Sequence, residues 1–443
     1  MNNVKLSRED IAKIEIGHTT ISRGHTALIC GIFLAVIFIY PPIQLIYEYR
    51  VRHLNHISEL HPLALPQQLS RTKIDVKNGI PNGLLGLSRD LAKTVKTYEN
   101  TLEDTSVLRA ILLPPVQRLL TTYLRLGNEK VIVGRDGWLF YAADFNYRVS
   151  PGFMRPERLK KRAASGIQPD PMLAIRQFHR ELKARDIELI LLPIPGKPML
   201  YGDKLGGRPS AVQNRSFADF YARAQAEGVR IIDLTADFAA MRAQGIEPYL
   251  RTDTHWTPEA MQFAARRLAR EIGNRKPLRP SSNAKITTLG DTAAMLKLQQ
   301  PQKLFSPETV TVRQIDVQPD RNAKILLLGD SFTNIFSLGG MGWGTHSGLA
   351  ETLAAELGEP IDVISRNDAG AHATRKLLHH ELQRGRDRLA GKKYVIWEFA
   401  VRELNDGDWQ LLDMKVQPAP EADFLSPKQP QEVSATVLAI SAI

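Results

Sequence analysis

Residues 324–332 read KILLLGDSF, an apolar run that ends directly in Gly329-Asp330-Ser331. A short apolar run that stops at a glycine and polar residues is typical of a buried strand leading into a helix. Similar runs alternate with helical patterns elsewhere in the chain, at residues 188–194, 230–233, 361–365 and 394–399. This alternation predicts an α/β fold, with a mostly parallel sheet that is flanked by helices on both faces.

Ser331 is the first candidate for chemistry, because it directly follows a predicted strand. A serine at a strand-to-helix turn presents its hydroxyl at the rim of the sheet, and the amides of the turn point to where an oxyanion would form. The lipase-type motif G-x-S-x-G is not met, since Thr333 stands at its last glycine position. The alternative is a turn in which Asp330 and Ser331 only cap the next helix.

A second polar motif, Asp253-Thr254-His255-Trp256, precedes Thr257-Pro258, a typical start of a helix. Residues two apart on an extended chain point to the same side, so Asp253 would hold the ring of His255 in one tautomer. The other ring nitrogen would be free to take a proton from a serine, which together with Ser331 predicts an Asp–His–Ser triad. The alternative is a loop histidine beside a solvated aspartate.

Residues 26–47 contain no charged residue and are long enough for one transmembrane helix. Pro41 and Pro42 are expected to kink or end that helix. Basic residues precede the apolar run, which favours a cytoplasmic N-terminus and a domain outside the cytoplasmic face. A cleaved signal peptide and a buried core helix are the alternatives.

The patterns divide the 443 residues into five predicted segments. A helical arm or connector is expected to follow the anchor, with helices over 87–108 and 116–126 on either side of Pro114-Pro115. The tail is rich in proline and is expected to be flexible. The five segments are a cytoplasmic N-terminus (1–25), the anchor (26–47), the arm (48–130), the catalytic domain (131–410) and the tail (411–443).

The composition excludes several classes of protein and site. The single cysteine, Cys30, rules out an intramolecular disulfide and any cysteine-rich metal site. The net charge of +11 favours anionic partners, but no basic run is interleaved with aromatic residues, so nucleic acid is not an expected partner. The sequence holds no phosphate-binding loop and no H-E-x-x-H helix, and we expect neither a metal nor a cofactor.

Taken together, the motifs resemble those of the alginate O-acetyltransferases of the AlgX/AlgJ type, over roughly residues 85–410. The segments that carry the resemblance are, in order, GRDGWLFY (134–141), PIPGK (193–197), DTHW (253–256), GDSF (329–332) and VIWEF (395–399) with Arg402. The resemblance implies an SGNH-hydrolase-like fold, with Ser331 as nucleophile, His255 as base and Asp253 as the residue that orients the base. In ordinary SGNH hydrolases the serine precedes the D-x-x-H motif, so the reversed order is similar to the alginate group.

The resemblance further implies an enzyme that is anchored in the inner membrane and acetylates an exopolysaccharide in the periplasm. The expected partners are the polysaccharide acceptor, a membrane-bound acyltransferase that donates the acetyl group, and other polysaccharide-export subunits. An acetyl-ester hydrolase with the same triad is a rival interpretation. A non-catalytic scaffold or glycan-binding subunit of an export complex is the second rival.

Five further residues are candidates for the oxyanion hole or for substrate contact. Gly370 is a candidate oxyanion glycine, and Asn367 or Asn334 a candidate asparagine donor. Lys197 is a candidate contact to an anionic sugar or to the donor, and Trp256 a candidate pocket wall. The alternatives are ordinary turn residues, a solvated lysine and a core tryptophan.

Two further expectations concern the surroundings of the site. Arg402 is a substrate candidate that is also expected to form an ion pair with Glu398. The glycine-rich residues 339–344 predict a mobile lid or a flexible loop.

Overall fold

The computed structural model describes residues 22–51, 80–208, 211–273, 278, 282–367 and 370–416. These residues form two compact units. One contains the described residues up to Leu120 together with Lys297–Gln299, and the other contains the rest, from Thr121 onward. The division falls at 120/121, whereas the sequence placed the start of the catalytic domain at 131. Most of the predicted cytoplasmic segment and of the predicted tail lies outside the described residues.

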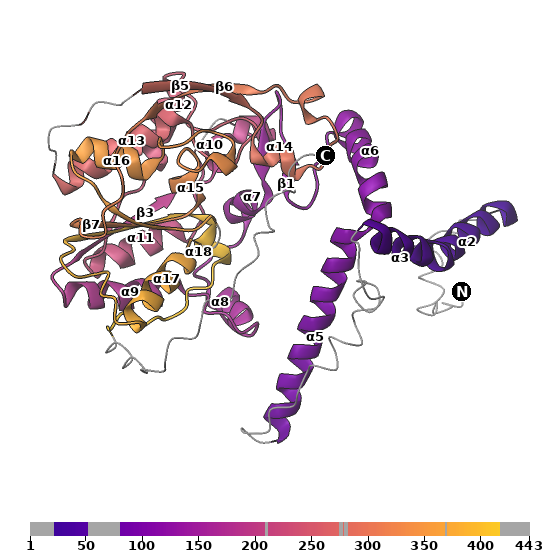
Figure 1. The fold of residues 1–443 in the computed structure, drawn as a ribbon, viewed down its shortest axis with the longest axis horizontal. Coiled ribbons are helices and arrows are strands. Elements are labelled where there is room, and N and C mark those ends of the chain that lie inside the picture. Colours follow the sequence, from indigo (N-terminus) through magenta and orange to yellow (C-terminus); the bar gives the residue numbers. More distant parts are fainter. Residues whose placement is uncertain are drawn as a thin grey trace, which may run out of the picture. The chain divides into compact units, whose positions relative to one another are not determined.

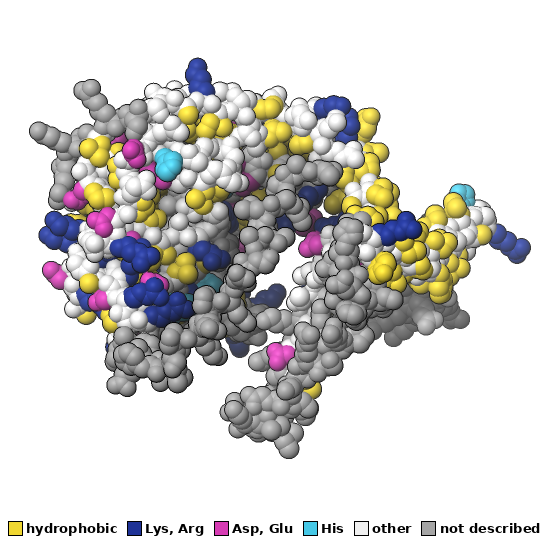
Figure 2. All heavy atoms as spheres, viewed as in Figure 1, with side chains coloured by type: hydrophobic (Ala, Val, Ile, Leu, Met, Phe, Trp, Pro, Cys, Tyr) yellow, Lys and Arg dark blue, Asp and Glu magenta, His cyan; other side chains and the backbone are white. Residues whose placement is uncertain are grey.

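The first unit contains the predicted anchor. Among the described residues, Arg23–Arg50 is the one helical segment long and apolar enough to cross a membrane, and none of its most apolar part is buried. It consists of α2 (Arg23–Phe38) and α3 (Tyr40–Val51), which are separated at Ile39. The break immediately precedes Pro41 and Pro42, as expected from prolines that cannot donate to the preceding turn. Figure 2 shows the hydrophobic side chains of this segment on the surface.

The arm is helical, but its break lies elsewhere than predicted. Helix α5 (Ile80–Thr105) and helix α6 (Val107–Leu124) meet at Ser106, and the predicted break at Pro114-Pro115 is wrong, because α6 continues through both prolines. The hydroxyl of Ser106 accepts a hydrogen bond from the amide of Arg109 at 3.2 Å. This capping bond marks Ser106 as the start of a new helix.

The second unit is built on a five-stranded sheet in which every pairing is parallel, which confirms the predicted α/β class (Figure 1). In spatial order the strands are β4 (Arg230–Ile231), β3 (Glu188–Ile194), β9 (Tyr394–Ala400), β7 (Ile325–Gly329) and β8 (Asp362–Ser365). The last strand of the sequence, β9, therefore lies between β3 and β7 at the centre of the sheet. All five strands coincide with apolar runs recognised in the sequence.

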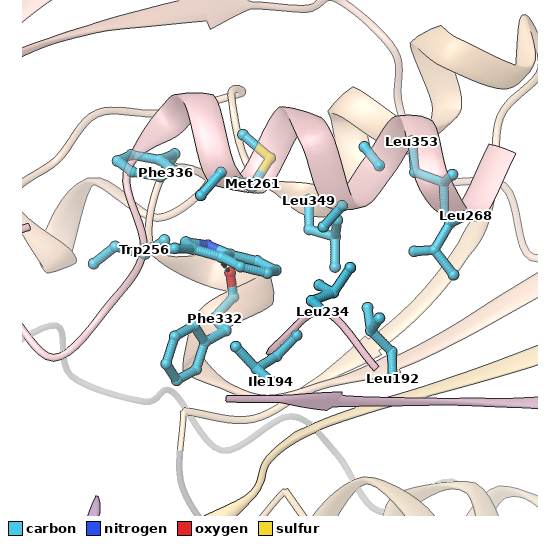
Figure 3. Close-up of a cluster of buried hydrophobic side chains, with 14 of the residues drawn as sticks. Leu192, Ile194, Leu234, Trp256, Met261, Leu268, Phe332, Phe336, Leu349 and Leu353 are labelled. Atoms are coloured by element: carbon cyan, nitrogen blue, oxygen red, sulfur yellow. Dashed lines mark hydrogen bonds between the residues drawn. The ribbon is translucent and has the colours of Figure 1, made fainter. Parts of the chain in front are cut away.

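Helices cover both faces of this sheet (Figure 1). One face packs against α9 (Pro171–Lys183), α11 (Phe217–Ala226) and α17 (Ala373–Gln383). The other packs against α12 (Thr235–Ala243), α13 (Pro258–Ile272) and α16 (Leu349–Leu357). Figure 3 shows part of the second core, in which the indole of Trp256 lies among side chains of β3, α13 and α16. Each fully buried leucine of such a core contributes about 1.5–3 kcal/mol.

Two antiparallel hairpins were not predicted. One pairs β1 (Val131–Val133) with β2 (Leu139–Tyr141), and the other pairs β5 (Ser282–Thr288) with β6 (Glu308–Gln314). The strands β5 and β6 are largely exposed and polar, so they lack the apolar runs by which strands were recognised. The remaining helices of this unit are α7 (Ala142–Val149), α8 (Pro156–Ala163), α10 (Lys197–Leu200), α14 (Asp291–Met295), α15 (Ser331–Asn334) and α18 (Arg402–Asp406), with 3-10 turns at Gly202–Leu205, Pro301–Lys303 and Gly339–Met341.

Candidate active site

The turn that carries Ser331 joins the end of β7 to the short helix α15. The side chain of Asp330 caps this helix, because its Oδ1 accepts from the amide of Phe332 at 2.8 Å, while its Oδ2 accepts from the amide of Ala400 at 2.9 Å. A Cβ on Gly329 would lie 2.1 Å from the hydroxyl of Thr333, so only glycine fits at the end of the strand. The capping role that was the alternative to catalysis belongs to Asp330, and it leaves the hydroxyl of Ser331 unused.

Glu398, on β9, lies directly behind this turn and is fully buried. Its Oε2 accepts from the amide of Asp330 and from the hydroxyl of Thr333, each at 2.8 Å. Burial, together with the neighbouring charge of Asp330, raises the pKa of Glu398 well above its usual range. The side chain therefore keeps its proton at neutral pH, and the turn rests on a neutral carboxyl.

The predicted ion pair between Glu398 and Arg402 is wrong. Arg402 instead pairs with Asp144 of α7 at 3.0 Å, and its guanidinium lies 6.0 Å from the centre of the Phe332 ring. Glu398 is engaged by the Asp330 amide and is neutral, so it offers Arg402 no charge. Arg402 contacts the residue next to Ser331 and braces the turn from the side of α7.

The loop that carries Asp253 and His255 is closed by an antiparallel bridge between Tyr249 and Trp256. Within it, Oδ1 of Asp253 accepts hydrogen bonds from the backbone amide of His255 at 3.0 Å and from its ring Nδ1 at 2.6 Å. The segment is therefore a turn that is stabilised by the aspartate, not the extended chain assumed from the sequence. The expected contact between the two side chains is nevertheless present.

The structure brings the three predicted triad residues together, although 76 positions separate His255 from Ser331. Nε2 of His255 lies 2.8 Å from Oγ of Ser331, while Nδ1 faces Asp253. All three side chains are buried, with exposed fractions of 1% for Asp253, 3% for His255 and 6% for Ser331. This geometry allows a proton to pass from the serine hydroxyl to an imidazole that the aspartate orients.

Both oxygens of Asp253 are occupied by hydrogen-bond donors. Its Oδ2 accepts from the amide of Asp291 at 2.9 Å and from Nε1 of Trp343 at 2.8 Å. Burial alone would raise the pKa of Asp253, but the hydrogen bond and charge of His255 outweigh it and lower the pKa. Asp253 is thus held as an anion. Burial would likewise lower the pKa of His255, but Asp253 raises it overall.

Trp343 and Asp291 are site residues that the sequence analysis missed. Trp343 lies in the glycine-rich segment 339–344, predicted as a lid or flexible loop, yet it is fully buried against Asp253. The prediction is wrong at this residue, because the indole N–H is needed by a buried carboxylate. Glycine spacing gave no sign of that contact.

The carboxylate of Asp291 is the second acid beside His255, with Oδ2 at 3.7 Å from Nδ1. Its Oδ1 accepts from the amide and the hydroxyl of Thr254. Burial and the charge of Asp253 raise the pKa of Asp291 to about 6. The ligand atoms of Asp253, His255 and Asp291 lie within 4.8 Å of one another, but the hydrogen bonds to both oxygens of Asp253 suit an oriented histidine better than a metal centre.

Lys197 was predicted to meet an anionic sugar or the donor, and the structure gives it a different place. Its side chain is 1% exposed, and Nζ donates to the backbone carbonyls of Leu250, Arg251 and Asp253 at 2.9, 3.2 and 2.5 Å. Burial lowers its pKa to about 8. Lys197 therefore holds the shape of the loop that carries Asp253, and it is not accessible to a substrate.

The remaining candidates surround the turn of Ser331. A Cβ on Gly370 would lie 2.8 Å from Cβ of Asp330, so the backbone of Gly370 closely approaches the turn. Nδ2 of Asn334 donates to Oδ1 of Asn367 at 2.7 Å. Within the described ranges, the amides of Ser331 and Gly370 have no hydrogen-bond acceptor. These two amides are therefore free to act as donors for an oxyanion.

Trp256 belongs to the core and is not a pocket wall. It is fully buried, and its Nε1 donates to the backbone carbonyl of Phe332 at 3.1 Å, as Figure 3 shows. The two rings also meet edge to face, at 5.4 Å between centres. Trp256 thereby links the loop of His255 to the turn of Ser331.

Comparisons with known proteins agree with this geometry. Residues 131–401 match the family described as "SGNH hydrolase-like domain, acetyltransferase AlgX". The chain is 26% identical over 292 residues to the probable alginate O-acetylase AlgJ of Pseudomonas fluorescens, covering 63% of this chain and 69% of that protein. It is 28% identical over 334 residues to the protein of the same name from Pseudomonas aeruginosa, covering 67% and 80%. Among solved structures, the O-acetyltransferase domain of Pseudomonas putida AlgJ matches with a TM-score of 0.47 at 23% identity, covering 62% of this chain and 92% of that chain.

Proposed function

The chain belongs to the AlgX family of acetyltransferases with an SGNH hydrolase-like domain, and from this we propose that it transfers acetyl groups to a polysaccharide through an acetyl-Ser331 intermediate. Membership makes the chain an acetyltransferase, and its named relatives are alginate O-acetylases. The single observation that carries the residue assignment is the 2.8 Å separation between Nε2 of His255 and Oγ of Ser331. The acceptor proposed for this chain is alginate or a similar exopolysaccharide.

In the first half-reaction, Nε2 of His255 takes the proton of the Ser331 hydroxyl as Oγ attacks the carbonyl carbon of the acetyl donor. The carbonyl oxygen becomes an oxyanion, which the free amides of Ser331 and Gly370 are placed to receive. The tetrahedral state collapses, and the bond to the donor breaks. The departing donor group takes the proton from His255 and leaves acetyl-Ser331.

In the second half-reaction, a sugar hydroxyl gives its proton to Nε2 of His255 and attacks the acetyl carbon of the intermediate. The bond to Oγ of Ser331 then breaks, and His255 returns the proton to the serine. Asp253 stabilises the imidazolium formed in each half, since its carboxylate lies 2.6 Å from Nδ1. Water in place of the sugar would make the same site an acetyl-ester hydrolase.

The proposed setting is the inner membrane, with α2 and α3 as a single-pass anchor and the catalytic unit in the periplasm. The apolar segment Arg23–Arg50 and the AlgJ relatives support this setting. Coenzyme A is scarce outside the cytoplasm, so we infer that a membrane-bound acyltransferase supplies the acetyl group. Other polysaccharide-export subunits are the remaining proposed partners.

The test uses the full chain and a chromogenic acetyl ester as donor. Mass spectrometry after a brief incubation should find an acetyl group on Ser331, and Ser331→Ala should abolish both that adduct and acetylation of added oligosaccharide. Release of acetate alone, with or without oligosaccharide, would establish the hydrolase instead. Undiminished polymer acetylation in cells that carry Ser331→Ala would point to a scaffold.

A further inference from the structure

A cavity of about 430 Å³ opens beside the turn between β1 and β2. Its walls are the end of α6 (Thr121, Thr122 and Arg125), the turn residues 133–137, and Leu304 with Phe305. No triad residue lines it. Cavities that bind small molecules typically measure about 300–1,000 Å³, so this one is large enough for a sugar ring.

Two unpaired cations line this cavity. In the part of the chain that the structure describes, the exposed guanidinium groups of Arg125 and Arg135 donate no hydrogen bond and form no ion pair. Asp136 is the only carboxylate among the lining residues, and its hydrogen bond goes to Lys204 at 2.6 Å. That bond lowers the pKa of Asp136, which is therefore an anion already matched by Lys204. The cavity keeps an excess of positive charge.

A third guanidinium extends this charge toward the loop of the triad. A Cβ on Gly137 would lie 3.7 Å from Cδ of Arg251, so the Arg251 side chain passes beside the cavity wall. Arg251 is exposed, and its guanidinium has no partner among the described residues. Its carbonyl accepts from the amide of Leu139 at 3.0 Å, and it precedes Asp253 by two positions.

The turn that presents Arg135 has a fixed shape. The amide of Arg135 donates to the carbonyl of Lys204 at 2.8 Å, and the carbonyl of Arg135 accepts from Trp138 at 3.1 Å. A Cβ on Gly134 would lie 2.6 Å from the ring of Phe140, and Gly137 has a φ of +76° that favours glycine. A bound anion therefore meets a backbone that is already ordered, which reduces the entropic cost of binding.

We propose that this cavity, with Arg125, Arg135 and Arg251, binds carboxylate groups of a uronic-acid polymer and so holds the acceptor chain beside the acetylation site. The inference rests on the proposed function, which it deepens by naming the charge of the acceptor. Guanidinium groups bind carboxylates with two parallel hydrogen bonds, whereas a neutral sugar offers no anion to relieve their mutual repulsion. The chain thus selects acidic polymers at a distance from Ser331.

The experiment measures binding in the absence of turnover. The full chain carrying Ser331→Ala is purified in detergent, and isothermal titration calorimetry gives its Kd for a uronic-acid hexamer and for a neutral glucose hexamer. Arg125→Gln and Arg135→Gln are each added to this background, with Arg180→Gln on α9, which lines no part of the cavity, as the matched control. Thermal unfolding confirms that each variant is folded, and Arg135→Lys keeps the charge without the planar fork.

The uronic-acid hexamer should bind at least about tenfold more tightly than the neutral one, and each glutamine variant should weaken it about threefold to tenfold. Arg135→Lys should bind with intermediate affinity, and Arg180→Gln should match the parent. Equal affinity for the two hexamers would overturn the proposal. So would unchanged binding in both glutamine variants, or displacement of the hexamer by sulfate at equal charge, which would show an unspecific anion site.

This outcome is independent of the proposed chemistry. If Ser331→Ala abolishes acetylation while the arginine variants bind like the parent, the acceptor site is wrong and the proposed function stands. If the arginine variants lose binding while Ser331→Ala still acetylates, the nucleophile is wrong and the anion site stands.

Discussion

The imidazole of His255 lies between two carboxylates, Asp253 at 2.6 Å and Asp291 at 3.7 Å from Nδ1. Both charges raise the pKa of the imidazole. A general base must be neutral, so a raised pKa moves the acid limb of the activity profile to higher pH. We expect kcat/KM to fall as the pH drops below the raised value, and to reach its plateau on the alkaline side.

Asp291→Asn should move this acid limb to lower pH by about half a unit to one unit, because one of the two negative charges is lost. The new amide oxygen still accepts from Thr254, so the loop keeps its shape. The pH profile of acetyl-ester turnover measures the shift, with Asp219→Asn on α11 as control. An identical limb in both variants would contradict the assigned role of Asp291.

Glu398 and Asp330 are adjacent acids with opposite expected tolerance to substitution. Glu398 is already neutral, so Glu398→Gln should cost less than about 1 kcal/mol in the free energy of unfolding. Both oxygens of Asp330 accept backbone amides, so Asp330→Asn would turn an N–H₂ toward a donor and cost about 1–3 kcal/mol. Urea unfolding of the two variants checks the difference, and the reverse ranking would show that Glu398 is ionised.

At the scale of elements, the apolar runs were sufficient to locate the sheet. Runs such as 188–194 and 394–399 became β3 and β9 because strands buried on both faces must be apolar throughout. The alternating residues of β5 and β6 follow no such rule, since these strands form a separate two-stranded hairpin and stay largely exposed. Ser106 ended a helix where two prolines did not, because a local capping hydrogen bond cannot be read from composition.

The segment between β5 and α14 presses on the loop of the triad. A Cβ on Gly290 would lie 2.3 Å from Cβ of Asp253, a contact that no side chain tolerates. Gly290→Ala should therefore displace Asp253, with a loss of about 1–3 kcal/mol in stability and at least about tenfold in kcat. Gly340→Ala, at a glycine with open space around its Cβ position, is the matched control.

Urea unfolding and acetyl-ester turnover test this pair of glycine variants together. If Gly290→Ala behaved like Gly340→Ala in both measurements, the packing between the two loops would not support the position of the aspartate.

At the scale of the whole molecule, the sequence predicted the class of fold, the anchor segment and which three residues would meet. It did not predict the residues that stabilise the triad, such as Trp343, because their role depends on contacts between segments far apart in sequence. Lys197 was misplaced for the same reason. A lysine in a loop is usually exposed, and only the folded chain shows the three carbonyls that surround this one.

The orientation of the anchor can be tested with the single cysteine. Cys30 lies in α2, so a membrane-impermeant maleimide should not label it in spheroplasts. Lys160→Cys on α8, in a Cys30→Ala background, should be labelled at once, because the catalytic unit is expected outside the cytoplasm. Labelling of this variant only after the membrane is permeabilised would reverse the proposed orientation.

Because β9 is the last strand made and lies between β3 and β7, the sheet cannot close until synthesis has passed Ala400. Until then, β3 and β7 lack their shared neighbour, and the two arms of the imidazole–alcohol pair have no common frame. A nascent chain is accordingly inert, and a nonsense mutation shortly before Tyr394 should leave no partial enzyme. If the chain is threaded unfolded across the bilayer, its reactivity would begin only in the compartment where its acceptor is found.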